Sequence, residues 1–276
     1  MRKILGLVGA SLVFAGPALA ADLANPVYKA PPLMPVSTWA GWYLGVNAGG
    51  NWGTSDSSTA VVSSGNFFTA PFCFPPANAC VVNTVDVQNA GAQRTHTSGF
   101  VGGGQIGYNW QFGNTVLGIE ADFDAFRSSG TSSKTVGLVS GVPRTVTVTS
   151  SMSTDWLFTL RPRLGWVANN WLFYATGGLA VSELKPSWTF SETAFRNSAG
   201  SSFSDTKAGW TVGGGVETMF ASRWIFGVEY LFVRFNDVSS TVPVVLPKGG
   251  GPAPQNFFHS ADLESNIVRA RLSYKF

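Results

Sequence analysis

Apolar and polar residues alternate with a period of two along most of the chain. Such alternation predicts β-strands that have one apolar face and one polar or small face. In one segment, Trp224, Phe226 and Val228 alternate with Gly227 and Glu229. The pattern recurs in eight segments, which are 42–52, 98–112, 115–126, 154–167, 171–181, 207–220, 224–235 and 266–276. The fifth segment fits least well, because Tyr174 falls on its polar face.

The connections between these segments alternate strictly between short and long. The short ones are 113–114, 168–170 and 221–223, and the long ones are 53–97, 127–153, 182–206 and 236–265. Ordinary domains rarely contain structureless loops longer than about 15 residues, whereas outer-membrane barrels combine tight periplasmic turns with large extracellular loops. Since lipid offers no partner for a free sheet edge, the sheet must close. We therefore predict an all-β fold, namely an eight-stranded antiparallel up-and-down transmembrane β-barrel with short periplasmic turns and four long extracellular loops.

The N-terminus predicts export. Residues 1–20 combine Arg2 and Lys3, an apolar stretch and a final Ala-Leu-Ala, which is typical of a cleaved signal peptide. The apolar stretch is too short for a membrane anchor, which needs about 20 residues. Residues 21–38 contain four prolines and predict an extended leader, so that the barrel occupies residues 39–276. After export we expect the protein in the outer membrane, in contact with its lipid and lipopolysaccharide.

Composition narrows the possible functions. Only 12% of residues are charged, about half of the roughly 25% usual for soluble proteins. The net charge of +3 leaves no basic surplus for a nucleic acid partner. A soluble ligand-binding barrel such as a lipocalin would line its cavity with the apolar face, which the charges on the opposite face disfavour. Cys73 and Cys80 lie in the first long loop, where a disulfide is expected and a metal pair is the alternative.

The alternation assigns the aromatic and aliphatic face to lipid and the charged face to the lumen. An eight-stranded barrel has an interior only just wide enough for its own side chains, so charges there must pair. We predict a structural charge network that plugs the lumen, with an ion pathway as the alternative. Its members are Glu120, Asp122, Asp124, Glu217 and Glu229 together with Arg161, Arg163, Arg269, Arg271 and Lys275.

Other motifs point to little chemistry. Gly102, Gly104 and Gly107 match a dinucleotide fingerprint, but no helix is expected after them to bind the phosphates. His96 and His259 fall in or near the extracellular loops; they are either solvated imidazoles or a haem or metal contact at the barrel mouth. No catalytic signature such as G-x-S-x-G or H-E-x-x-H is present, so we expect no enzyme and no cofactor. The alternative is a hydrolase built from Ser, His and Asp residues at the rim of the barrel.

The strand sequences carry a family resemblance. Stretches such as WAGWYLGVNAGGNWG (39–53), FVGGGQIGYNWQFGNTVLGIEADFDA (100–125), DWLFTLRPRLGWV (155–167), GWTVGGGVETMF (209–220), GVEYLFVRF (227–235) and the terminal VRARLSYKF are similar to alphaproteobacterial small outer-membrane β-barrel surface antigens. This porin-family group is similar in fold to the membrane domain of OmpA and to the opacity proteins. The resemblance implies a structural surface antigen that supports envelope integrity. Some relatives are credited with pore formation, haemin binding or host contact, which leaves a narrow porin or ligand and host binding through the loops as alternatives.

The C-terminal strand carries a further implication. Leu272, Tyr274 and Phe276 alternate with polar residues up to the chain end, which resembles the signal that the barrel-assembly machinery recognises. Its physical basis would be docking of a strand edge, with the terminal aromatic ring in a pocket. The alternative is that Phe276 only belongs to the periplasmic aromatic girdle.

Overall fold

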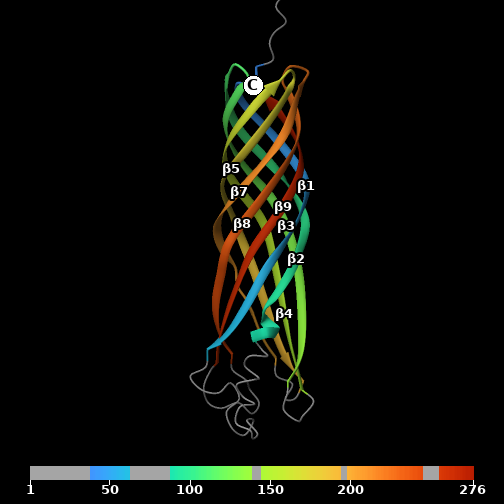
Figure 1. Ribbon diagram of the computed structural model, residues 1–276, viewed down its shortest axis with the longest axis vertical. Helices are drawn as coiled ribbons and strands as arrows, with labels where there is room; N and C mark the ends of the chain where they lie inside the picture. Colours follow the sequence, from blue (N-terminus) through green and yellow to red (C-terminus); the bar gives the residue numbers. More distant parts are fainter. Residues whose placement is uncertain (1–37, 63–87, 139–143, 194–197, 245–254) are drawn as a thin grey trace, which may run out of the picture. The chain divides into compact units, whose positions relative to one another are not determined.

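The computed structural model describes residues 38–62, 88–138, 144–193, 198–244 and 255–276 (Figure 1). These residues form nine strands and one helical turn at 88–91. The strands are β1 (Gly41–Val62), β2 (Gln93–Phe112), β3 (Thr115–Leu138), β4 (Arg144–Ala168), β5 (Trp171–Glu192), β6 (Ser198–Ser202), β7 (Asp205–Phe220), β8 (Trp224–Val244) and β9 (Gln255–Lys275).

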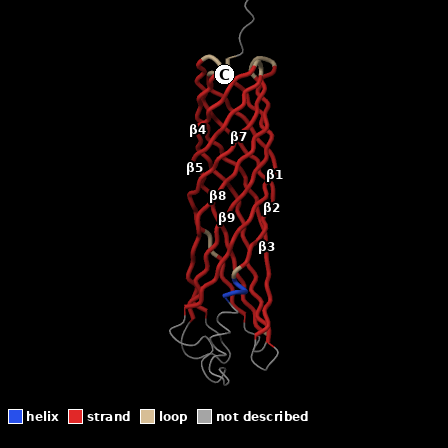
Figure 2. Tube along the Cα trace, in the orientation of Figure 1, coloured by secondary structure: helices blue, strands red, loops and turns tan. Residues whose placement is uncertain are grey.

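Eight of these strands close into an antiparallel ring. Around the ring the order is β1, β2, β3, β4, β5, β7, β8 and β9, and β9 pairs with β1 (Figure 2). Each of these strands therefore has a partner on both sides in the lipid-facing part. The short β6 pairs with β5 in the same register as β7 does, since Ser187 lies opposite Ser202 and Leu184 opposite Asp205. The predicted eight-stranded barrel is therefore confirmed, and β6 extends the line of β7.

The three short turns lie where the sequence predicts them. Gly113 has φ 60° and Asn169 has φ 56°, and both residue types tolerate the left-handed backbone that tight hairpins need. The third turn places Ala221 and Ser222 in the same region, at φ 49° and 63°. A residue with a Cβ has a steric cost in this backbone region. The pairing of β7 with β8 on either side of the turn keeps the turn in this conformation.

The strands continue far into the predicted long loops, so the prediction of those loop boundaries was wrong. β1 reaches Val62 instead of 52, β3 reaches Leu138 instead of 126, and β9 begins at Gln255 instead of 266. Hydroxyl side chains pair across β3 and β4, at 3.0 Å for Thr131–Ser151, 3.0 Å for Ser133–Thr149 and 2.9 Å for Thr135–Thr147. Thr favours strands, and these pairs support a sheet whose outer face is polar. The alternation pattern detects strands by an apolar outer face, so it does not mark this part of β3 and β4.

Large apolar side chains cover the outside of the barrel. Trp42 is 57% exposed and Val46 61% exposed, whereas Tyr43 and Asn47, which directly follow them in the chain, are buried. The same outward set includes Leu44, Trp52, Phe100, Ile106, Trp110, Leu117, Phe123, Leu164, Trp166, Phe173, Trp210, Val212, Phe226, Tyr230, Val268 and Leu272. The assignment of the apolar face to lipid is confirmed. Among the described residues, no helix is long and apolar enough to cross a membrane.

One seam of the barrel wall is unpaired beyond the lipid-facing part. The β7–β8 ladder ends at the pair Gly209–Phe235, while β8 goes on to pair with β9 up to Val244. In the described part of the chain, β6 and the first residues of β7 therefore have no strand partner on the β8 side. Residues 238–244 likewise have none on the β6 side.

Candidate functional site: the buried charge network

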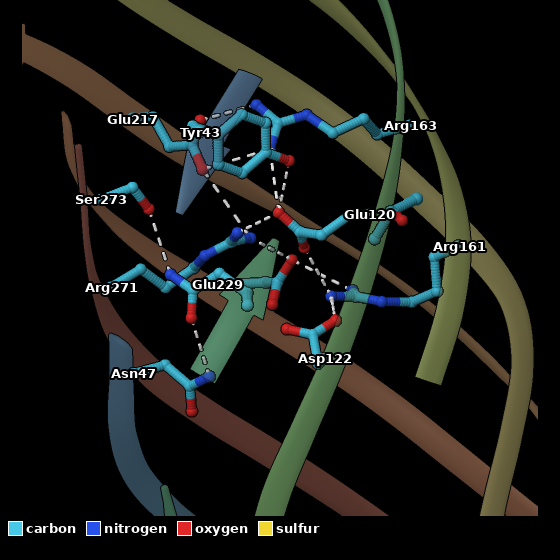
Figure 3. A network of polar contacts seen from close by, with 12 residues as sticks. Tyr43, Asn47, Glu120, Asp122, Arg161, Arg163, Glu217, Glu229, Arg271 and Ser273 are labelled. Carbon is cyan, nitrogen blue, oxygen red and sulfur yellow. Dashed lines mark hydrogen bonds and ion pairs between the residues drawn. The ribbon is translucent and has the colours of Figure 1, made fainter. Parts of the chain in front are cut away.

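Charged side chains fill the middle of the barrel interior. Figure 3 shows part of this layer, in which side chains of β1, β3, β4, β7, β8 and β9 point toward one another. Because side chains of a strand alternate between the two faces, residues two apart enter the lumen together. The charged members are Glu120, Asp122 and Asp124 of β3, Arg161 and Arg163 of β4, Glu217 of β7, Glu229 of β8, and Arg269 and Arg271 of β9. Each is 3% exposed or less.

Glu229 is the centre of the network. Its carboxylate lies 3.1 Å from the Arg161 guanidinium, 2.6 Å from that of Arg269 and 2.8 Å from that of Arg271. Three strands, β4, β8 and β9, thus meet through one buried carboxylate. Such contacts are what a buried carboxylate needs, because its desolvation costs several kcal/mol unless it is paired and hydrogen-bonded.

The β3 carboxylates bind the same arginines from the other side. Glu120 lies 2.8 Å from Arg161 and 3.3 Å from Arg163, and it also contacts Arg271. Asp122 lies 2.7 Å from Arg161 and 2.6 Å from Arg269. The arginines therefore bridge β3 to strands on the far side of the lumen.

Two further carboxylates close the ends of the network. Glu217 lies 2.6 Å from Arg163. Asp124 lies 2.7 Å from Arg269 and accepts a hydrogen bond of 2.9 Å from the Asn47 side chain. Every guanidinium of the layer contacts at least two carboxylates.

Two tyrosines belong to the network, although the sequence analysis assigned them no role. The Tyr43 hydroxyl donates to Glu120 at 2.6 Å, and the Tyr174 hydroxyl donates to Glu229 at 3.0 Å while accepting from Arg271 at 2.7 Å. The Arg163 guanidinium lies 4.4 Å from the centre of the Tyr174 ring. The position of Tyr174 on a polar face was the signal for this role.

Lys275 lies apart from the carboxylates. Its ammonium donates to the backbone carbonyls of Thr38 and Ala40, the latter at 3.4 Å, beside the short turns. Lys275 was predicted to join the charge network, but its ammonium lies at the rim of the barrel. The reason is that Lys275 occupies the last inward position of β9. The layer thus holds five carboxylates, Glu120, Asp122, Asp124, Glu217 and Glu229, and four guanidiniums, Arg161, Arg163, Arg269 and Arg271.

Two buried apolar clusters lie on either side of the charged layer. The cluster toward the long connections includes Phe126, Leu157, Leu184, Leu231, Val233, Phe235 and Ile267. The cluster toward the short turns includes Trp39, Val116, Leu172, Met219 and Ile225. Neither cluster was predicted from the sequence, because the inner face was expected to be polar throughout. The signal was the run 230–233, in which apolar residues occupy both faces of β8.

The two histidines lie on opposite sides of the barrel wall. His96 is exposed on the outside, whereas His259 is buried inside, beyond the lipid-facing band. The His259 Nδ1 atom lies 2.9 Å from the Thr59 hydroxyl, and its ring stacks on Trp188 at 4.4 Å. Burial lowers the pKa of His259 to about 4. The structure therefore does not bring these two imidazoles into one site.

The other predicted sites divide between described and undescribed residues. Cys73, Cys80 and the signal peptide lie outside the described residues. Leu272 and Phe276 are exposed on the outside of β9 or directly after it, and the Tyr274 ring packs edge-on against Phe276 at 5.6 Å. The glycines 102, 104 and 107 lie inside β2. Within the described ranges, no group of three or more His, Cys, Asp or Glu residues could hold a metal ion.

The family model and the relatives that the chain matches are those of outer-membrane proteins. The family model of the outer membrane protein beta-barrel domain matches residues 7–276. The chain is 33% identical over 281 residues to the 31 kDa outer-membrane immunogenic protein of Brucella melitensis, covering 100% of both chains. It is 32% identical to the 22 kDa outer membrane protein of Rhizobium leguminosarum over 57% of this chain and 61% of that one. The outer membrane protein OprG of Pseudomonas aeruginosa shares a TM-score of 0.43 and 11% identity, over 86% of this chain and 97% of its own.

Proposed function

Because the chain belongs to the outer membrane protein beta-barrel family and resides in the outer membrane, we propose that it is a non-catalytic structural protein there, with a lumen closed to ions and solutes. One observation carries this proposal, which is that every guanidinium of the charged layer is held by two or more carboxylates. Arg269, for example, contacts Asp122, Asp124 and Glu229 at 2.6–2.7 Å.

The energetics of the interior favour a closed lumen. A passing ion would have to replace several short, buried ion pairs at once, and separating one such pair leaves an uncompensated buried charge. It would also have to cross the apolar cluster toward the short turns, and hydrophobic constrictions exclude water and ions by dewetting. A network held in this way supports the barrel wall from inside, which suits a protein that strengthens the envelope.

Single-channel recording tests this proposal against the narrow-porin alternative. The purified barrel is inserted into planar bilayers, and a general porin in the same bilayers serves as the positive control. We expect no discrete conductance steps from the wild-type barrel at verified insertion. Stable unitary steps, with a selectivity that changes when Glu217 is replaced by Gln, would support a conducting lumen and overturn the closed one.

We also propose that the protein is a surface antigen, in line with the immunogenic relative in Brucella. The paired hydroxyls of β3 and β4 lie beyond the apolar band, where the barrel wall projects out of the lipid. Antibodies raised against the folded barrel should bind intact cells, and cells lacking the gene serve as the control. Binding that requires permeabilised cells would contradict surface exposure.

A further inference from the structure

The outer wall of β1, β2 and β9 changes character over three neighbouring rows of outward side chains. In the row nearest the short turns, Phe100 and Val268 are both large, exposed and apolar. Gly50 lies between them, and a Cβ added there would meet no atom closer than 3.8 Å. This row is the end of the lipid-facing band toward the long connections, and it contains an open apolar notch.

The next two rows combine one indole with polar groups. In the first of these rows, Ser98, Trp52 and Asn266 lie side by side on the three strands. The next row toward the long connections consists of His96, Thr54 and Glu264. These six residues line a groove of about 350 Å³ on the outside of the barrel. Trp52 is 50% exposed, so its ring is available as a flat wall of the groove. Tryptophan is typical of such boundaries, because its ring suits lipid and its N–H suits water.

Some polar groups of the groove are held in position and others are free. The Asn266 amide oxygen accepts a hydrogen bond from Tyr230 at 2.7 Å, and its amide nitrogen donates to the Trp52 carbonyl at 3.3 Å. The side chains of Thr54, His96 and Ser98 have no hydrogen-bond partner within the part of the chain that the structure describes. The groove thus offers a fixed amide beside unused hydroxyl and imidazole groups.

Two guanidiniums border the groove. Arg94 lies one row further toward the long connections and pairs with Asp56 at 2.7 Å. Arg234 pairs with Glu264 at 3.1 Å. The Arg94–Asp56 pair is well exposed, and such surface pairs contribute little to stability. A phosphate can therefore replace a carboxylate on Arg94 at small cost, with the two-point geometry that guanidinium groups favour.

The vertical order of the wall identifies the ligand. From lipid outward it presents an apolar notch, an aromatic plane, a set of hydroxyl-binding groups and a cation. A sugar ring has C–H faces that pack on an aromatic plane and hydroxyl edges that need donors and acceptors. We propose that this groove binds the sugar–phosphate headgroup of an outer-leaflet lipopolysaccharide molecule, with one acyl chain in the notch at Gly50. This inference rests on the outer-membrane location and not on whether the lumen is closed.

Native mass spectrometry of the detergent-solubilised full-length mature chain tests the proposal. The probes are deep-rough lipopolysaccharide and phosphatidylglycerol, which is anionic but lacks a sugar. We expect one lipopolysaccharide molecule to bind more tightly than phosphatidylglycerol. Trp52→Ala should weaken lipopolysaccharide binding about tenfold, the effect of losing one good aromatic contact. Trp42→Ala is the matched control, because Trp42 is an outward Trp on the same strand, 57% exposed, at the other end of the barrel.

A second variant keeps the test independent of folding defects. Ser98→Phe fills the groove without removing a packed side chain, so it should reduce lipopolysaccharide binding while the barrel melts at the wild-type temperature. Equal losses for Trp52→Ala and Trp42→Ala would mean that lipid binds the whole belt, and would overturn the proposal. Equal affinity for phosphatidylglycerol would also overturn it, since the groove would then recognise charge without sugar.

Discussion

At the scale of single residues, each buried charge forms ion pairs with several others, so replacing one of them leaves its partners without a counter-charge. Arg161 contacts Glu120, Asp122 and Glu229, which come from two strands other than its own. Breaking a buried ion pair by removing one partner is much more costly than the pair's net contribution to stability, because the remaining charge stays desolvated.

Arg161→Ala should therefore lower the free energy of unfolding by about 3–5 kcal/mol. Urea unfolding of the barrel in lipid vesicles, followed by tryptophan fluorescence, measures the change. Arg127→Ala is the control, because Arg127 is exposed on the outside of β3 and has no ion pair with any described residue. A loss for Arg161→Ala no larger than for Arg127→Ala would indicate that water already solvates the network.

His259 predicts a pH dependence of the outer end of the barrel. Its pKa is about 4 because burial disfavours the charged ring, whereas an unfolded His titrates near about 6.5. Between these values the unfolded state binds more protons, so stability falls as the pH drops from about 6.5 to about 4 and levels off below. Hydrogen exchange of β9 residues 257–263 at pH 7 and pH 5 measures this. His259→Phe should abolish the difference, and His96→Phe should leave it unchanged.

At the scale of elements, most strands are held on both sides, and the exceptions lie outside the lipid. Among the strands that the structure describes, β6 pairs only with β5, and the end of β8 pairs only with β9. Inside the lipid-facing part such free edges would leave backbone groups unpaired, whereas beyond it water can bind them.

The seam between β6 and β8 should exchange its amide hydrogens quickly. Residues 198–202 and 239–243 each have one free edge, so alternate amides there have no partner in the described ladders. We expect their protection to be lower than that of 225–234 by several orders of magnitude. Hydrogen exchange in detergent micelles, resolved by fragment, measures this. Equal protection would mean that the seam is closed by other parts of the chain.

The end of β9 separates assembly from stability. The Phe276 backbone N–H donates to the Trp42 carbonyl at 3.0 Å, and its exposed ring adds little buried area. If the ring serves as an assembly signal, deletion of Phe276 should leave unfolded chains in the periplasm, while barrel refolded in detergent loses only about 1–3 kcal/mol. Fractionation of cells and unfolding of the refolded variant measure the two effects. Normal outer-membrane levels of the variant would leave Phe276 as part of the aromatic girdle alone.

At the scale of the whole molecule, the interior is layered, and the layers differ in their access to water. Beyond the charged layer, the inner walls of β1, β2, β3 and β9 carry buried polar side chains without hydrogen-bond partners in the described ranges, namely Asn51, Thr97, Ser128 and Ser265. The opposite wall at this level is apolar, with Leu231 and Val233 of β8. Buried polar groups without protein partners are normally satisfied by internal water.

We therefore predict that water enters the outer half of the lumen and stops at the charged layer. Single cysteines are placed in a Cys73→Ser, Cys80→Ser background and treated from outside with a small water-soluble thiol reagent. Asn51→Cys should react faster than Leu231→Cys, although both positions flank Ile267 at the same level. Ser273→Cys, which lies between the network and the short turns, should not react. Equal reaction of Asn51→Cys and Ser273→Cys would indicate a continuous channel.

The sequence alone determined the number of strands, the lipid face, the three tight turns and nearly all the inward charges. It did so because a strand between lipid and a polar lumen must alternate along its own length, and that constraint is local. Only the tertiary structure decided which charges pair. Arg269 and Asp122 are 147 residues apart in the chain and meet only after β1 and β9 close the ring, in a register that no local pattern encodes. The strand extensions were equally hidden, because outside the lipid the outward positions of these Thr- and Ser-rich strands are largely polar, so the contrast between an apolar outer face and a polar inner face is lost.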